Sequence, residues 1–176
     1  MNTFLEILTE IKDLLLENIV VFNQGYAHAR LDAGKGLVVT TGNESRYVGV
    51  NDVEGDYFYI RVPDAITSIS TKAKTDCNVA ISQKYSCTLV AAVNEADEFQ
   101  LSDAIVNVLL KTKVADVKAV WLDAIAIAEN EFKGLAKDAL NAVKARIGNR
   151  TIVRIDFDLT RIFETHNCEY QICKPC

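Results

Sequence analysis

The sequence lacks the long apolar run and the clustered basic residues that mark two large classes of protein. No apolar stretch reaches the ~20 residues that a membrane-spanning helix needs, so we expect no membrane protein. The 19 Lys and Arg residues are scattered and the formal net charge is −5, which argues against an extended phosphate-binding surface. We therefore expect neither a membrane partner nor specific recognition of nucleic acid.

Proline and glycine are also scarce, with two and eight residues in the chain. Together with 49% hydrophobic and 24% charged residues, this scarcity excludes a disordered chain and indicates a globular one. A chain of this length buries about 70% of the surface that it exposes when unfolded, so its core needs no metal or disulfide. We predict a single domain over residues 1–164, followed by a cysteine-containing tail over residues 165–176.

The first residues, MNTFLEILTEIKDLLLEN, contain acidic residues and lack the basic region of a signal peptide. We therefore expect a cytosolic protein, in which cysteines are free thiols by default. The five cysteines are an odd number, which also excludes complete pairing within one chain.

Recognisable catalytic motifs are missing from the chain. There is no G-x-S-x-G, and neither His28 nor His166 stands in a nucleophile–base motif. The GKG at 34–36 lacks the spacing of a phosphate-binding loop, and NDVEGD at 51–56 lacks that of an EF-hand, so we interpret both as turns. We expect no catalytic residues and no cofactor, and hence a protein that is not an enzyme.

Two pairs of acidic residues are weaker candidates. Asp156 and Asp158 share one face of a predicted strand, as the carboxylates of a glycosidase would, but a solvated strand face has the same pattern. Glu129 and Glu131 stand in AENEF, which we interpret as the solvated start of a helix.

The C-terminal stretch HNCEYQICKPC concentrates possible metal ligands, in H-x-C-x4-C-x2-C order: His166, Cys168, Cys173 and Cys176. Thiolate and imidazole suit tetrahedral zinc, and the cysteine spacing matches part of the plant-type [2Fe–2S] ligand run. Structural zinc sites usually draw ligand pairs from two separate turns, and the cluster needs a further distant cysteine. We predict a strand end with free thiols and no metal, with a local Cys173–Cys176 disulfide as the alternative.

The two other cysteines stand in or beside a predicted strand. Cys87 lies between Ser86 and Thr88 in the middle of that strand, and we interpret it as a small core residue. Cys77 carries no stronger sign of a reactive thiol.

Hydrophobic periodicity predicts three helices. Residues 2–18 begin with a capping box of Thr3 and Glu6, and residues 96–113 and 131–149 show the same period. The expected apolar face of the first helix comprises Phe4, Leu5, Leu8, Ile11, Leu15 and Leu16. The segment 114–128 is compatible with a strand over 114–121 or with the front of a long helix.

Strand patterns fill most of the remaining chain. Short strands joined by turns are expected over 19–56, and further strands over 57–62, 65–74, 78–94 and 150–164. The last of these alternates polar and apolar residues, so one of its faces meets solvent or a partner. The order of elements predicts an α+β fold with a mostly antiparallel sheet, an N-terminal helix and two or three helices packed on one face.

The stretch ISQKYSCTLVAAVNEADEFQLSDAIVNVLLKT resembles the centre of phage tail-terminator and related head–tail connector (neck) proteins. In those proteins a long strand with a Tyr and an apolar run leads through an acidic turn into an amphipathic helix. The first helix, the middle strands and the closing RTIVRIDFDLTRIF fit the same order. The insertion at 30–75, the segment 114–128 and the cysteine tail depart from that pattern.

The resemblance implies a non-enzymatic virion structural protein that assembles in the host cytoplasm into a closed homo-oligomeric ring at the neck or tail end. Its partners would be other neck or tail proteins. An acidic chain suits a lumen through which DNA passes, because like charge repels phosphate. Such a ring protein would expose apolar strand or loop residues among 37–62.

The alternative is a small cytosolic α+β enzyme or ligand-binding domain whose site follows no motif. It would be a compact monomer or dimer, and one concave pocket would contain a residue with a shifted pKa.

Overall fold

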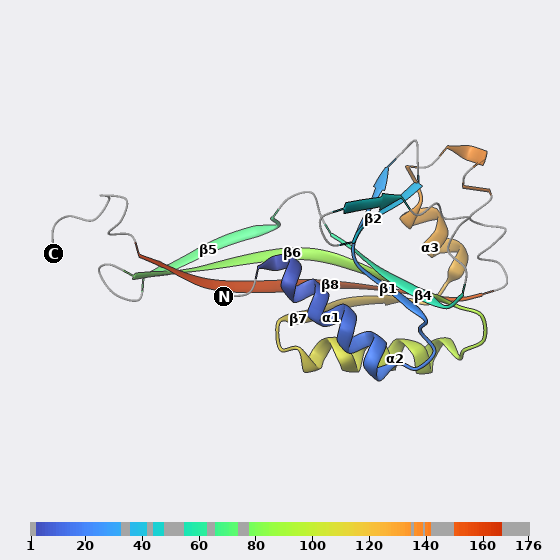
Figure 1. Ribbon diagram of the computed structural model, residues 1–176, viewed down its shortest axis with the longest axis horizontal. Helices are drawn as coiled ribbons and strands as arrows, with labels where there is room; N and C mark the ends of the chain where they lie inside the picture. Colours follow the sequence, from blue (N-terminus) through green and yellow to red (C-terminus); the bar gives the residue numbers. More distant parts are fainter. Residues whose placement is uncertain are drawn as a thin grey trace.

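The described part of the chain folds into one eight-stranded sheet with helices on both faces (Figure 1). The computed structural model describes residues 3–32, 36–41, 44–47, 55–62, 66–73, 78–134, 136–138, 140–141 and 150–166. Its elements are α1 Phe4–Asn18, β1 Gln24–Asp32, β2 Gly36–Thr41, β3 Glu44–Tyr47, β4 Tyr57–Arg61, β5 Ser68–Ala73, β6 Asn78–Val93, α2 Glu98–Lys111, β7 Ala115–Trp121, α3 Ala124–Glu131 and β8 Thr151–His166. The predicted α+β class with an N-terminal helix is confirmed.

The sheet is mostly antiparallel, and its two longest strands, β6 and β8, lie side by side. The strand order is β3-β2-β1-β4-β6-β8-β7, with β5 paired to the outer half of β6. Strands β1 and β4 pair in parallel, and the other described pairs are antiparallel. Strands β6 and β8 pair continuously from Asn78↔His166 to Val93↔Thr151. At about 3.3 Å per residue, this central ribbon is roughly 50 Å long.

Helix α1 begins where the sequence predicts. The Thr3 hydroxyl accepts a hydrogen bond from the Glu6 N–H at 3.2 Å, and the Glu6 carboxylate accepts one from the Thr3 N–H. Leu8, Ile11 and Leu15 are at most 1% exposed, whereas Leu5 is 45% exposed. The prediction that Leu5 belongs to the buried face is wrong, because a turn of ~100° per residue places it roughly 90° from the centre of that face.

Two hydrophobic cores lie on opposite faces of the sheet, because successive strand residues point to opposite sides. On one face, α1 and α2 pack on Leu89, Ile155 and their same-face neighbours. On the other face, Ile127 and Phe132 of α3 pack on Tyr59 and the residues around it. The predicted packing of two helices on one face holds for α1 and α2, and α3 covers the opposite face.

The segment 114–128 resolves into strand β7 followed by helix α3. Asp123 starts α3, since its carboxylate accepts hydrogen bonds from the N–H groups of Ile125 and Ala126. The predicted start of a helix at residue 131 is therefore wrong: α3 ends there, and residues 132–134 form a turn. Residues 137, 138, 140 and 141 are helical, and residues 142–149 lie outside the described part of the chain.

None of the described helices combines the length and apolar character needed to cross a membrane.

Leu8 and Leu5, which lie on the buried and the exposed side of α1, provide a test of this packing. We expect Leu8→Ala to lower the free energy of unfolding by about 2–5 kcal/mol, because it removes a fully buried side chain and leaves a cavity. Leu5→Ala, the matched control on the same helix, should change it by less than about 1 kcal/mol. Urea denaturation followed by circular dichroism measures both values, and equal losses would contradict the observed orientation of α1.

Candidate functional site

Most of the predicted metal-ligand candidates lie outside the described residues. This holds for Cys77, Cys168, Cys173 and Cys176, while the backbone of His166 closes β8 opposite Asn78. Among the described residues, no group of three or more His, Cys, Asp or Glu is arranged to hold a metal ion. The expectation of free thiols in the tail stays a prediction.

Cys87 is a buried core residue. It is 2% exposed, and its Sγ lies 3.8 Å from the carbonyl oxygen of Tyr85. Burial raises the pKa of the Cys87 thiol to about 12, with a further contribution from the negative charge of Asp158. The thiolate that a nucleophile or metal ligand requires is therefore disfavoured.

The acidic turn at 51–56 is described at its end alone. Gly55 has a φ of +85°, a left-handed conformation that glycine adopts without strain. The Asp56 carboxylate accepts a hydrogen bond from the Asn94 N–H at 2.7 Å, and its carbonyl accepts one from Asn23 at 2.8 Å. Asp56 thus ties two chain connections together. Residues 51–54, and residues 34 and 35 of the GKG turn, lie outside the described part.

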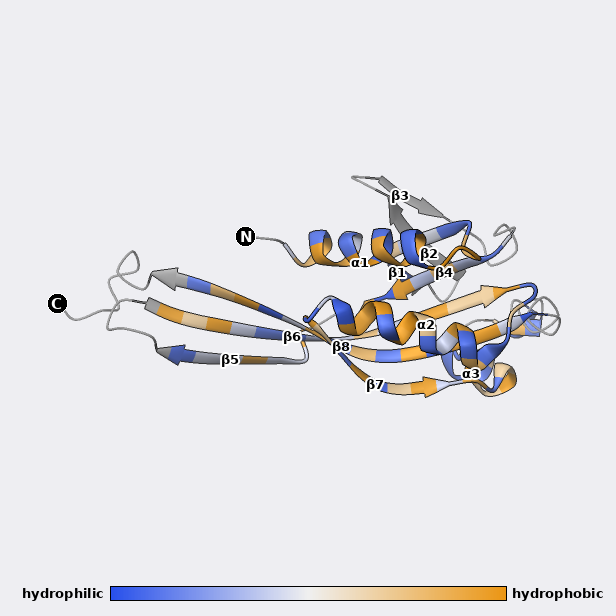
Figure 2. Cartoon of the chain, turned by 90° about the horizontal axis from the view of Figure 1, so that it is seen from below, coloured by the Kyte–Doolittle hydropathy of each residue, from blue (hydrophilic) through white to orange (hydrophobic). Residues whose placement is uncertain are grey.

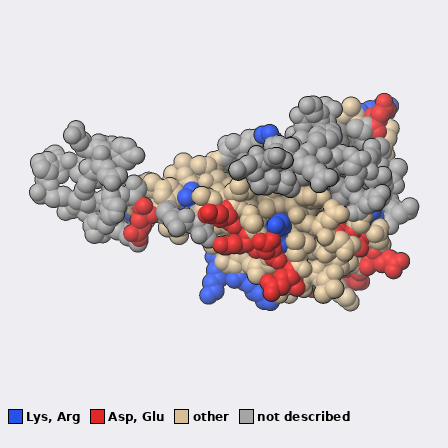
Figure 3. Space-filling model, in the orientation of Figure 1, with Lys and Arg blue, Asp and Glu red and all other residues tan. Residues whose placement is uncertain are grey.

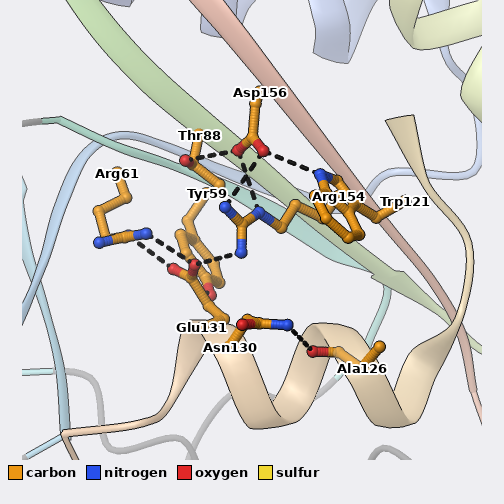
Figure 4. Close-up of polar contacts among 9 residues, drawn as sticks. All are labelled: Tyr59, Arg61, Thr88, Trp121, Ala126, Asn130, Glu131, Arg154 and Asp156. Atoms are coloured by element: carbon orange, nitrogen blue, oxygen red, sulfur yellow. Dashed lines mark hydrogen bonds and ion pairs between the residues drawn. The ribbon is translucent and has the colours of Figure 1, made fainter. Parts of the chain in front are cut away.

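Asp156 and Asp158 share one face of β8, as predicted, and lie on the side opposite to α1 and α2. Figure 4 shows Asp156 surrounded by donors from three strands. Arg154 contacts both of its oxygens, at 3.0 and 3.1 Å, while Trp121 Nε1 and Thr88 Oγ1 each donate to it at 2.9 Å. Burial alone would raise the pKa of Asp156, but these hydrogen bonds outweigh it and hold the pKa below 3.8.

Asp158 occupies a second polar cluster, two residues further along β8. Lys84 Nζ lies 2.7 Å from one carboxylate oxygen, and Ser86 Oγ donates to the other at 2.7 Å. Lys118 approaches to 3.6 Å, and Thr67 Oγ1 donates to Ser86 Oγ at 3.1 Å. Burial would raise the pKa of Asp158, yet the hydrogen bonds from Lys84 and Ser86 lower it overall. Both carboxylates are thus engaged within the sheet.

Glu131 is buried, contrary to the prediction from the sequence. Glu129 is exposed, but the Glu131 side chain has no exposed surface, so the interpretation of a solvated helix start is wrong for Glu131. The sequence contains one indication of this burial. Glu131 lies four residues after the buried Ile127, and residues four apart share a helix face. Glu131 lies at the end of α3 and points at the sheet (Figure 4).

Two arginines and a tyrosine surround the Glu131 carboxylate. Arg61 Nη2 donates to Oε2 at 2.9 Å, and Arg61 Nε lies 2.8 Å from Oε1 without the alignment of a hydrogen bond. The Tyr59 hydroxyl lies 3.3 Å from Oε1, and Arg154 Nη1 3.9 Å from Oε2. Burial raises the pKa of Glu131, and the arginines offset part of that effect.

These contacts form a continuous chain of alternating charges: Arg61, Glu131, Arg154 and Asp156. Glu131 is fully buried and the other three members are partly buried. Removing the charge of Glu131 or of an arginine beside it therefore leaves an opposite charge unpaired, at a cost of several kcal/mol. Since the charges satisfy one another, the network joins α3 to β4 and β8. We interpret it as a structural brace.

A second distinctive feature is the arm, which we define as residues 66–73 of the β5 segment, 78–84 of β6 and 160–166 of β8. It extends from the body of the molecule as a three-stranded ribbon (Figures 1 and 2). None of its described side chains, at 66–72, 79–84 and 160–164, is buried. Ile69 is 60% and Ile162 67% exposed.

The two faces of the arm differ in character. Strand register places one set of residues on the face that we call apolar: Ile69, Thr71, Val79, Ile81, Gln83, Arg161 and Phe163. The opposite face is mainly polar, but it also contains the exposed Ile162; its other members include Ser68, Ser70, Lys72, Ser82 and Lys84. The apolar face continues the side of the sheet that α1 and α2 cover in the body, so the helical layer ends where the arm begins. Phe4 marks this boundary, because its ring stacks on Tyr85 at 3.9 Å.

A groove lies at the root of the arm, on the same side of the sheet as α1. Its volume is about 590 Å³, and it is lined by Ile7, Glu10, Ile11, Leu14, Thr112, Lys113, Val114, Thr160, Arg161 and Ile162. We call it the α1 groove. Three of its four α1 residues are apolar, and Glu10, Lys113 and Arg161 are its charged lining residues.

The expectation of exposed apolar residues among 37–62 is not met where those side chains are described. Phe58, Tyr59 and Ile60 are all at most 2% exposed. The exposed apolar residues are found instead on the arm, at Ile66, Ile69 and Ile162, and at scattered positions of the body.

Comparison with known proteins gives no family: no family model matches the chain, and neither does any curated protein.

The brace predicts a large effect of a small substitution. Glu131→Gln should lower the free energy of unfolding by about 3 kcal/mol, because it removes the charge between Arg61 and Arg154 while preserving shape. The matched control is Glu129→Gln, two residues away on the exposed side of α3, with an expected change below about 1 kcal/mol. Equal stability of the two variants in urea denaturation would contradict the brace.

Asp156 gives a pH-dependent test. Its folded pKa lies below the unfolded value of 3.8, so its stabilisation is present above pH 3.8 and is lost as the pH falls through the folded pKa. Asp156→Asn should therefore destabilise the protein at pH 7 by about 1–3 kcal/mol, and the difference from wild type should shrink below pH 3.8. Thermal unfolding across pH 2–7 measures it, with the exposed Asp103→Asn as control. A difference that stays constant with pH would refute the assignment.

Proposed function

We propose that this chain is a non-enzymatic virion structural protein of a tailed phage, which forms an oligomeric ring at the head–tail neck or the tail end. The observation that carries the proposal is the arm, an ordered ribbon in which no described side chain is buried. Such a protein acts through its surfaces, by contacts with further copies and with neck or tail proteins. The acidic net charge of −5 suits a lumen through which DNA passes.

The arm gains little stability from its own packing. Three strands need a buried hydrophobic face or a covering layer for stability, and the described residues of the arm have neither. Full burial of an isoleucine contributes about 1.5–3 kcal/mol, so covering Ile69, Ile81 and Phe163 would release a substantial free energy. A subunit that covers the arm of its neighbour supplies that burial.

The β7 edge of the sheet is protected against strand pairing, which favours the arm as the surface for assembly. A β-bulge interrupts the β7–β8 register between Val117 and Ala119. Lys118, at the bulge, pairs with Asp116 and approaches Asp158. Bulges and charged residues are the features by which sheet edges avoid pairing with other chains.

The order of elements supports the resemblance to tail-terminator and neck proteins. Long strand β6 carries Tyr85 and an apolar run, and it leads through a turn at residues 94–97 into the amphipathic helix α2. Asp97 caps that helix by accepting a hydrogen bond from the Gln100 N–H at 2.9 Å. Strand–turn–helix is the pattern on which the resemblance rests.

The enzyme alternative requires a concave pocket and a perturbed titratable residue in one place. The α1 groove is concave, but the buried Glu131, whose pKa is raised, lies on the opposite face of the sheet. The sheet therefore separates Glu131 from the α1 groove. This separation favours the assembly role.

Solution mass is the direct test of the ring. We expect size-exclusion chromatography with light scattering to give a defined multiple of the 19.5 kDa subunit. Ile69→Glu should reduce that multiple, because it places a charge on the apolar face of the arm. Ser70→Glu is the matched control, since the adjacent residue points to the polar face. A wild-type protein that remains monomeric across the accessible concentrations would contradict the proposal.

A further inference from the structure

We infer that the tip of the arm is a structural zinc site, in which Cys77 and Cys168 form one ligand pair and Cys173 and Cys176 form the other. The four cysteines lie outside the described residues. The inference rests on the register of the described strands that lead to them and on the length of chain in between. It goes beyond the proposed function and does not depend on the ring.

The strands of the arm bring two distant parts of the sequence to one place. Strand β5 ends at Ala73, β6 begins at Asn78, and β8 ends at His166, which pairs with Asn78. These three strand ends lie together at one end of the molecule (Figure 2). The connection 74–77 and the tail 167–176 therefore both start from the tip of the arm. Four of the five cysteines of the chain belong to these two segments.

The covalent chain keeps Cys77 close to Cys168. Cys77 directly precedes Asn78, and Cys168 follows His166 by two residues. Paired Cα atoms of antiparallel strands lie about 5.5 Å apart or less, and consecutive Cα atoms about 3.8 Å apart, so the two cysteine Cα atoms are separated by at most about 17 Å. Cys87 is nine residues further along β6 than Asn78, about 30 Å away and buried in the main core.

The spacing of the cysteines fits the two ligand pairs of a structural zinc site. Cys173 and Cys176 have the C-x2-C spacing of a pair that comes from a single turn. The sequence favoured free thiols because its candidate ligands stood in a single stretch. The register adds Cys77 from a second part of the chain, next to Cys168. With this second pair, the inferred site replaces the expectation of free thiols in the tail.

Zinc at this position stabilises a ribbon that its own packing holds weakly. None of the described side chains of the arm is buried, and strands without a covering layer are marginally stable. Figure 3 shows the arm as a narrow projection beside the body of the molecule. Because the four ligands come together only in the folded arm, the free energy of zinc binding adds to that of folding. In a reducing compartment the cysteines stay available as thiolate ligands.

Metal analysis of the full, untagged chain tests the site. After purification under reducing conditions, we expect mass spectrometry of the elements to find one zinc ion per chain. Competition with a chromophoric chelator measures the affinity. Cys77→Ser and Cys173→Ser should each raise the Kd for zinc at least about tenfold, because each removes a ligand of a different pair. The control Cys87→Ala should leave it unchanged, since Cys87 is buried in the core. Circular dichroism of the helices confirms that each variant is folded.

Cobalt(II) counts the thiolate ligands independently. Added to the metal-free wild type, it should give the absorption of a tetrahedral site with four thiolates, and His166→Ala should not change that spectrum. A wild-type chain that binds neither zinc nor cobalt would overturn the inference, as would a spectrum that depends on His166. Unchanged affinity of Cys77→Ser beside a weakened Cys173→Ser would also overturn it, because the site would then lie in the tail alone. Light scattering on the same samples reports the ring separately.

Discussion

The continuous pairing of β6 with β8 is the constraint on which the rest of the structure depends. Each strand has 16 residues, and the two stay in register from end to end. The helices α1 and α2 cover only part of that length. The same ribbon is therefore a buried centre of the body at one end and an uncovered arm at the other. The same pair of strands therefore forms both the centre of the main core and the proposed assembly surface.

Side chains alternate between the two faces of β6 and β8, and the two faces carry different kinds of residues. Residues such as Leu89 and Ile155 build the main core beneath α1 and α2. Their immediate neighbours on the other face, including Arg154 and Asp156, build the charged network that holds α3. Burial of Glu131 is tolerated because two guanidinium groups lie beside it. Polar residues on this face thus fix the position of a helix.

The apolar face of the arm and the α1 groove lie on one side of the sheet and meet at residues 160–162. One is an apolar ribbon with basic residues, and the other is an apolar groove beside an acidic helix. The protected β7 edge limits the alternatives, because its bulge and Lys118 disfavour pairing with a further strand. The proposed assembly role rests on these features.

Local signals in the sequence predict several elements correctly: the capping box and apolar stripe of α1, the stripe of α2, the long strands β6 and β8, and hence the α+β class. They also place Asp156 and Asp158 on one strand face. Other features follow from long-range packing: the burial of Glu131, the exposure of Leu5, the split of residues 114–134 into β7, α3 and a turn, and the existence of the arm. Periodicity reports which residues share a face, but burial depends on which distant element covers that face and where its coverage ends.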